Sequence, residues 1–487
     1  MRDIKDFFEA DCIWQIPETD SCWHGNVYIR PGKEIRLKII KFVSASEVDS
    51  CLARMPMKIK IIQGTGGNEI TLLNGLKTAF SKSISGTTEQ AKVESTYSFL
   101  YALIGELFSS EDEIKFKDVM VTFTNMSNWT EEKISKKLIE DVFIGEKGNS
   151  EVIPIFSNNN FELSIFKSFK RDYRIQQMSL KCYSELLIKS KDNYLDLYEY
   201  LKIAYSFAVF LSLSEVKNVY PQNVRAGLPD KIIDIYLTNN FSQDTTTVYS
   251  FEMLFTYENI KEKISQILEN WFKLTEEETL FYDAWSTYFY YSNIKSISPS
   301  LLFILLMEAL EAYHKKEKDK RWNAKIVLKD EINDKIGLEL KEISNILKSF
   351  ECQIEEEIYS TLMNRLNIFK DSTLKSAIND MLEAYRKITL VDVTIKDIPE
   401  LKSLDQLIDV IVFLRNLLTH RDKRNLNNQK IIDYNNPKTI DKINNKIDHI
   451  IKVLLFADLG FPRQVINKEI IRYQNFIKNV FYLSDET

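Results

Sequence analysis

The chain lacks the segments that carry proteins into a membrane or out of the cell. Residues 1–6 contain none of the apolar core of a signal peptide. No stretch reaches about 18 uninterrupted apolar residues, the length that a membrane-spanning helix needs. Cysteine is scarce too, with five residues that are odd in number and widely scattered. Such a set indicates free thiols in a reducing compartment, so we expect a cytoplasmic protein without membrane contact.

Metal-binding patterns and an overall basic charge are also missing. No C-x-x-C pair occurs, and no cluster of Asp, Glu, His and Cys has the spacing of a metal site. We therefore expect no metal and no cofactor, and a metal-dependent nuclease is a weak hypothesis. The net charge is -6, so any contact with nucleic acid has to come from local patches.

A chain of 487 residues is too long for one ordinary core and predicts two to four domains. Residues 1–165 show strand patterns, with apolar or alternating runs at 26–29, 35–40, 57–62, 69–73 and 119–123. Residues 64–68 are rich in glycine but lack the phosphate-loop pattern, and we expect a hairpin turn there. We interpret this region as a β-rich domain.

The helical periodicity increases toward the C-terminus. Residues 166–295 mix strand patterns at 178–183 and 232–237 with helical patterns at 194–213 and 257–272, and we expect a mixed α/β middle region. Residues 296–487 predict only helices, at about 301–314, 338–357, 359–370, 372–386, 404–420, 438–458 and 465–481. Gly460 is expected as the glycine just after the end of the sixth of these helices. The predicted class is therefore α+β multidomain, with an all-α bundle at the C-terminus.

The residues that carry chemistry lie on the helix predicted at 404–420. Arg415, Asn416 and His420 form an Arg-Asn-x-x-x-His run, and the basic residues Arg421, Lys423 and Arg424 follow at once. Metal-free RNA cleavage needs a base for the 2′-hydroxyl and a cation for the charge that gathers on phosphorus. Imidazole, with an ordinary pKa of about 6.5, and guanidinium supply these two functions.

The five-residue spacing between Arg415 and His420 restricts how they can meet one phosphate. Positions i and i+5 lie about 140° apart around a straight helix. Either the helix distorts or ends near His420, or a second copy of the chain completes the site. Apolar residues of 301–310 and 407–414 would then hold the two copies together. A non-catalytic alternative is that Arg415 extends from the helix to solvent and His420 caps it.

Two resemblances give this run a context. Arg-Asn-x-x-x-His on an apolar helix resembles the signature of the HEPN superfamily, whose helical domains mostly act as metal-independent ribonucleases. In the N-terminal half, Trp23-His24-Gly25-Asn26-Val27, then Ile62-Gln63-Gly64-Thr65 before Ile70-Thr71-Leu72-Leu73, and later Asn128-Trp129, resemble the N-terminal domain of ApeA-type proteins. Those proteins are bacterial anti-phage factors with a C-terminal HEPN domain.

The resemblance implies an endoribonuclease that acts in abortive infection as a homodimer or larger homo-oligomer through the HEPN domain. RNA would be the substrate, with tRNA as one candidate, and a phage-derived trigger would release the activity. His420 would be the base or acid, Arg415 the phosphate clamp and Asn416 an orienting group. The three basic residues after His420 would hold the RNA backbone by charge.

An acidic residue often lies against the motif arginine in HEPN domains. Glu308 and Glu311 are embedded in the apolar run 301–314, and we take Glu308 as the candidate partner of Arg415, the alternative being that it faces solvent. The rival function is a HEPN-fold sensor or interaction module that cleaves nothing. Because Arg, Asn and His are all present, the enzyme is favoured.

Overall fold

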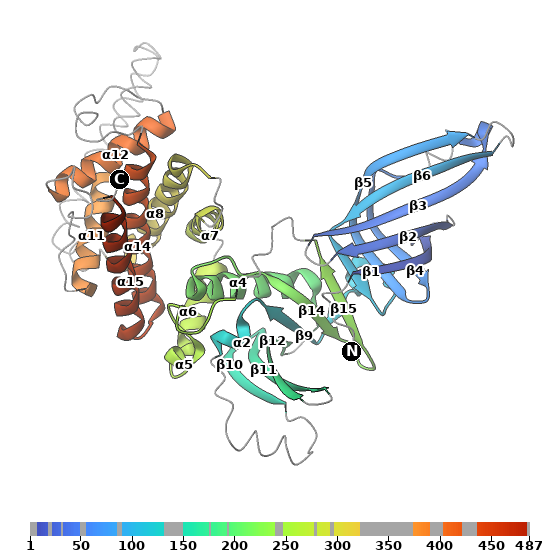
Figure 1. The fold of residues 1–487 in the computed structure, drawn as a ribbon, viewed down its shortest axis with the longest axis horizontal. Coiled ribbons are helices and arrows are strands. Elements are labelled where there is room, and N and C mark those ends of the chain that lie inside the picture. Colours follow the sequence, from blue (N-terminus) through green and yellow to red (C-terminus); the bar gives the residue numbers. More distant parts are fainter. Residues whose placement is uncertain are drawn as a thin grey trace, which may run out of the picture. The chain divides into compact units, whose positions relative to one another are not determined.

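The computed structural model describes residues 7–17, 22–30, 33–48, 55–84, 90–130, 150–174, 177–191, 194–238, 247–276, 280–292, 297–321, 374–389, 403–420 and 436–484. The chain forms two compact units, residues 1–269 and residues 270–487 (Figure 1). The first unit is dominated by β-strands and the second by helices, so the predicted α+β class is confirmed. The finer division of the chain at residues 165 and 295 stays a prediction.

Unit 1 contains a large antiparallel sheet of thirteen described strands, in the order β10-β11-β12-β9-β14-β15-β7-β5-β4-β1-β2-β3-β6. Two shorter strands, β8 and β13, pair separately. The strands are β1 (Phe8–Gln15), β2 (Cys22–Arg30), β3 (Glu34–Ser44), β4 (Lys58–Gly66), β5 (Glu69–Ile84), β6 (Gln90–Phe99), β7 (Tyr101–Ile104), β8 (Lys115–Phe116), β9 (Asp118–Phe123), β10 (Glu151–Ser157), β11 (Phe161–Arg174), β12 (Gln177–Ser190), β13 (Leu195–Asp196), β14 (Pro221–Gly227) and β15 (Ile232–Leu237).

One end of this sheet closes into a ring of six strands. Strand β6 pairs with β3 along one edge and with the second half of β5 along the other, which closes the cycle β1-β2-β3-β6-β5-β4. The first half of β5 pairs with β7 and continues into the open part of the sheet. The strand changes partners near Gly75, where a Cβ would lie 2.4 Å from the ring of Phe99, so only glycine fits.

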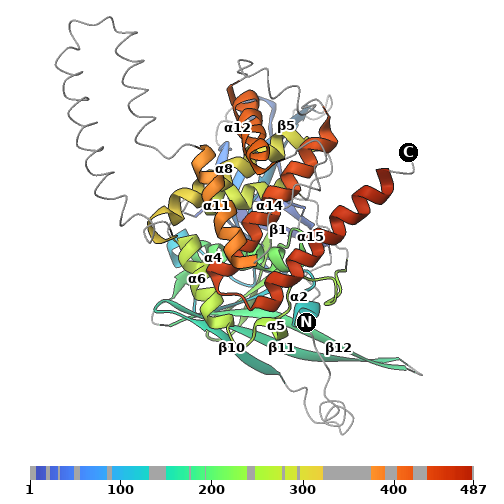
Figure 2. The same cartoon turned by 90° about the vertical axis from the view of Figure 1, so that its left-hand side faces the viewer.

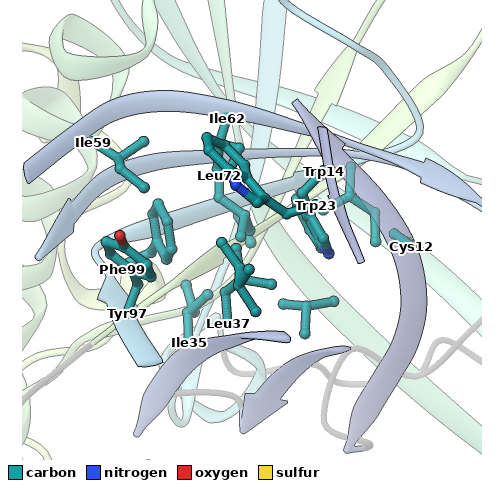
Figure 3. Close-up of a cluster of buried hydrophobic side chains, with 14 of the residues drawn as sticks. Cys12, Trp14, Trp23, Ile35, Leu37, Ile59, Ile62, Leu72, Tyr97 and Phe99 are labelled. Carbon is teal, nitrogen blue, oxygen red and sulfur yellow. The ribbon is translucent and has the colours of Figure 1, made fainter. Parts of the chain in front are cut away.

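The ring is filled by the inward side chains of its alternating strands (Figure 3). Trp14 is fully buried and donates its indole N–H to the carbonyl of Gly25 at 2.8 Å, and the hydroxyl of Tyr97 donates to the carbonyl of Pro56 at 3.0 Å. Each large apolar side chain buried in this way contributes about 1.5–3 kcal/mol. The predicted turn at 64–68 connects β4 to β5, where Thr65 pairs with Glu69, and is confirmed as a hairpin.

Short helices accompany the open part of the sheet. The longest, α4 (Leu197–Glu215), begins at Asp196, which accepts a hydrogen bond from the backbone of Glu199, and it packs on β9 and β14. The ring of Trp129, in α2 (Met126–Trp129), packs edge-on against Phe207 of α4. Two further helices follow along the chain, α5 (Tyr257–Ile260) and α6 (Ile264–Glu276), and α6 includes the unit boundary at residues 269 and 270. One-turn 3-10 segments lie at Ala45–Glu47, directly after β3 of the ring, and at Glu111–Glu113.

The secondary structure described in unit 2 consists of helices (Figure 2). Its helices are α7 (Leu280–Ser292), α8 (Pro299–Arg321), α11 (Leu374–Thr389), α12 (Leu404–His420), α14 (Pro437–Leu459) and α15 (Arg463–Ser484). Helix α14 packs against α8, α11 and α15, and Gly460 ends it with a φ of 83°, as the sequence predicts. The helices predicted at 338–357 and 359–370 lie outside the described residues.

No helix in the described ranges combines the length and the apolar character needed to cross a membrane. The thiols of Cys12 and Cys22 are free.

A buried polar network joins α11, α14 and α15. The Nδ1 atom of His449 lies 3.0 Å from Glu469, and its Nε2 atom lies 3.0 Å from the hydroxyl of Tyr385. The carboxylate of Glu469 also accepts two hydrogen bonds from Arg472, at 2.7 and 2.8 Å. The ring of Tyr473 stacks on the imidazole, with centroids 4.2 Å apart. The network therefore fixes three helices against one another.

The protonation states in this network follow from its geometry. Burial opposes ionisation of Glu469, but hydrogen bonds from His449 and Arg472 outweigh it and lower the carboxyl pKa to about 2. Burial lowers the pKa of His449 below its ordinary value of 6.5. A neutral imidazole therefore donates its Nδ1–H to the carboxylate, and its Nε2 accepts from the hydroxyl of Tyr385.

Replacing Glu469 with Gln should lower the free energy of unfolding by about 1.5–3 kcal/mol, because a neutral amide loses the charge-assisted hydrogen bonds that the buried carboxylate accepts from His449 and Arg472. The wild-type protein should lose stability as the pH falls through about 6.5. In that range His449 binds a proton in the unfolded chain, whereas the buried imidazole, whose pKa is lowered, stays neutral. Urea unfolding of the full chain, followed by its helical circular dichroism across that range, measures both effects.

The matched control is Asp405→Asn, which removes an exposed carboxylate of α12 and should change the free energy of unfolding by less than about 1 kcal/mol. An unfolding curve of Glu469→Gln that superimposes on that of the control would show that the network contributes nothing to stability.

Candidate active site

Helix α12 carries the Arg-Asn-x-x-x-His run and is held by its apolar face. Ser403 precedes the helix, and its side-chain oxygen accepts the backbone N–H of Gln406 at 3.2 Å. The helix packs against α8 and α11, and an ion pair of 2.8 Å joins Asp409 to Lys375 of α11. The side chains buried along it are Leu407, Ile408, Val410, Ile411, Phe413 and Leu414.

Arg415 lies at the edge of this buried face. Its Nε donates to Oε1 of Glu311, on α8, at 3.1 Å. The side chains of Arg415 and Glu311 are 29% and 40% exposed, so the pair lies at the surface of the unit. One hydrogen bond to a carboxylate orients the guanidinium plane, while its partial exposure leaves it within reach of an external anion.

Two carboxylates of α8 are candidates for the arginine partner. The structure places Glu311 on Arg415, while Glu308 lies one turn earlier on the same helix and is exposed. The pairing of Glu308 with Arg415 stays a prediction. Both carboxylates interrupt the same apolar run, and the sequence pattern alone carries no information about which of them faces α12.

The other predicted site residues are described to different extents. Asn416 is exposed next to Arg415. His420 is the last residue of α12, and its side chain lies outside the described part of the structure, as do the basic residues Arg421, Lys423 and Arg424. The structure therefore locates the side chain of Arg415, whereas for His420 it gives the backbone position alone.

The backbone of α12 fixes where the Cα atoms of Arg415 and His420 lie relative to each other. The helix is uninterrupted between Arg415 and His420, and the hydroxyl of Thr419 donates to the carbonyl of Arg415 at 2.6 Å within it. Five residues of regular helix separate the two Cα atoms by about 7.5 Å along the axis and by about 140° around it. A distortion between them is therefore not the means by which they meet one phosphate. The end of α12 at His420 and a second copy of the chain are the two options that agree with this geometry.

No group of three potential metal ligands comes together within the residues that the structure describes. Arg415 is instead a partly exposed cation that contacts the carboxylate of Glu311. A phosphate that approaches Arg415 competes with Glu311 for the guanidinium, which offers five N–H donors in all.

Two protein families match the chain. The family described as ApeA N-terminal domain 1 matches residues 11–271, and the family described as Apea-like HEPN matches residues 304–465. The second range contains Glu311, Arg415 and His420. The first match covers more than half of the chain, and both resemblances noted in the sequence are confirmed. Neither the curated proteins nor the solved structures contain a match to the chain.

A double-mutant cycle can identify the arginine partner. Glu311→Gln and Arg415→Gln should show a coupling of about 0.2–1 kcal/mol in the free energy of unfolding, because the pair is exposed and screened by solvent. Glu308→Gln provides the matched control, and its coupling with Arg415→Gln should be near zero. Chemical denaturation of the four proteins in each cycle measures both couplings, and a larger coupling for Glu308 would reverse the assignment.

Proposed function

The chain belongs to the ApeA N-terminal domain 1 family and carries an Apea-like HEPN domain, and from this membership we propose that unit 2 is a metal-independent endoribonuclease. The observation that carries the proposal is the position of Arg415. Its guanidinium is oriented by Glu311 at the surface of the unit, five residues before His420 on one helix. A histidine and an oriented arginine are the groups that metal-free RNA cleavage needs.

The proposed reaction is an internal transesterification. His420 takes the proton of the 2′-hydroxyl, and the 2′-oxygen forms a bond to phosphorus. The bond from phosphorus to the 5′-oxygen then breaks, and that oxygen takes up the proton that His420 accepted, directly or through water. The products are a 2′,3′-cyclic phosphate and a 5′-hydroxyl.

The neighbouring residues have supporting roles in this proposal. Arg415 binds the non-bridging oxygens while negative charge gathers on them, and Asn416 orients the phosphate. Arg421, Lys423 and Arg424 hold the RNA backbone without reading its sequence. RNA, with tRNA as one candidate, is the substrate. We further propose a role in anti-phage defence by abortive infection in the cytoplasm, in which unit 1 restrains the nuclease until a phage-derived cue arrives.

We also propose that two chains share the site. Because α12 is regular between Arg415 and His420, a second copy is the simplest way to bring both groups to one phosphate. The apolar residues of 407–414 that are buried within the chain are not available to a partner. The interface is expected on outward positions, among them the exposed Leu301 and the half-buried Leu305, Val412 and Leu418.

His420→Ala and Arg415→Ala should each reduce RNA cleavage by at least about a hundredfold, because each removes one of the two groups that act on the reacting phosphate. Total RNA incubated with the purified protein in excess EDTA, followed by analysis of the new 3′ ends, measures the loss and the end chemistry. Thr419→Ala, at an exposed neighbour, is the control and should cleave like the wild type.

Cleavage by His420→Ala at the wild-type rate would refute the assignment of the base. Activity that disappears in EDTA and returns with magnesium would indicate a metal-dependent nuclease. A wild-type protein that leaves RNA intact under every condition but still dimerises would support the rival function, a HEPN-fold interaction module.

Mixing experiments test the shared site at fixed total protein. If one site needs His420 of both chains, activity should fall as the square of the wild-type fraction when His420→Ala chains are added, whereas a site that takes only one histidine gives a linear decline. If each site takes Arg415 from one chain and His420 from the other, a mixture of the two inactive variants should regain activity. A strictly linear decline together with no regained activity would contradict the shared site.

A further inference from the structure

The outer face of the six-stranded ring contains a hollow that the proposed nuclease does not use. Outward side chains of β2, β3, β5 and β6, together with Phe7 just before β1, surround a space of about 420 Å³. This volume suits a small ligand or a single unit of a larger one. The inward side chains of the same strands fill the apolar core, so the hollow is built on a rigid support.

Three aromatic side chains line the hollow, namely Phe7, Tyr28 and Phe80. Phe7 and Phe80 are 49% and 64% exposed, although phenylalanine is among the residue types most often buried. The rings of Phe7 and Tyr28 have centroids 6.4 Å apart. Exposed rings gathered at one concave position provide faces on which a planar group can stack.

Cations line the same hollow. Arg30 and Arg36 share the carboxylate of Glu34, at 3.4 and 2.7 Å. Lys38 lies 3.1 Å from the carboxylate of Glu94, which Lys92, outside the lining, also contacts. Three lining cations therefore face two lining carboxylates. Because these ion pairs are exposed, they are weak and can exchange toward a ligand anion at little cost.

The six strands of the ring carry a net positive charge, like the cations that line the hollow. Its six strands contain nine Lys and Arg residues and five Asp and Glu residues, whereas the chain as a whole has a net charge of -6. The ring is thus a basic region within an acidic protein, which favours an anionic ligand.

We propose that this hollow binds a nucleotide, with its base stacked on the aromatic side chains and its phosphate held by Arg30, Arg36 and Lys38. The ligand supplies both a planar ring and an anion, which is the combination that the lining presents. Either a free nucleotide or one nucleotide of a single-stranded RNA has this chemistry. The proposal concerns unit 1 and does not depend on cleavage by unit 2.

Isothermal titration of the full chain tests the proposal with four probes: AMP, ATP, inorganic phosphate and a short 2′-O-methyl oligoribonucleotide, which lacks the hydroxyl that cleavage needs. The nucleotide probes should bind, and more weakly as salt is raised. Phe80→Ala and Arg36→Gln should each weaken this binding at least about fivefold. Both positions are exposed, so melting curves should show that the variants remain folded.

Two control variants lie on the same ring but outside the hollow. Phe42→Ala removes a phenylalanine that is 67% exposed on β3, and Lys60→Gln removes an exposed cation of β4. Both should bind the nucleotide probes within about twofold of the wild type, since neither lines the hollow.

The outcomes separate the sources of the ligand. Binding of AMP or ATP that is lost in Phe80→Ala and Arg36→Gln supports a free nucleotide. Much tighter binding of the oligonucleotide, with the same dependence on these variants, supports a nucleotide within RNA. Equal binding of phosphate and AMP with no effect of Phe80→Ala would overturn the proposal. Failure of every probe to bind, or equal weakening by the control variants, would overturn it as well.

Discussion

The helical repeat of α12 is the constraint on which the candidate active site depends. With about 3.6 residues per turn, the apolar positions from Leu407 to Leu414 face α8 and α11, and burying them fixes the rotation of the helix. That rotation carries Arg415 to the edge of the buried face, where it meets Glu311. The same repeat turns the Cα of His420 away from it. The helical repeat therefore places Arg415 beside Glu311 and also separates it from His420, its proposed catalytic partner.

Local patterns in the sequence predicted the elements of the fold well. The helix at 404–420, the glycine after α14 and the hairpin between β4 and β5 follow from periodicity and turn chemistry within a few residues. Closure of the six-stranded ring could not be predicted in this way. It requires β5 to pair with β7 over one half and with β6 over the other, and strand order depends on contacts far apart in the chain.

The candidate site was predictable to a similar extent. The motif identified Arg415 because one arginine, placed five residues before a histidine on an apolar helix, is a local pattern. Its partner depends on the rotation of α8 against α12, a tertiary property that distinguishes Glu311 from Glu308. His449, by contrast, belongs to no local motif, and it is buried. Its partners Tyr385 and Glu469 come from two other helices, so no sequence spacing points to the network.

Two arginine–glutamate pairs in the described part of unit 2 differ in their surroundings and therefore in how easily they separate. Glu469 is fully buried and accepts two hydrogen bonds from Arg472. If Arg472 moved away, the negative charge of Glu469 would lose this compensation in the interior. Glu311 contacts Arg415 through Nε, and both side chains are partly exposed, so water can replace either partner at little cost. Residue type is therefore not what distinguishes a structural arginine from one that can exchange its carboxylate for a phosphate. Burial of the carboxylate distinguishes them, and by that measure Arg415 is the arginine of the two that is suited to bind a substrate.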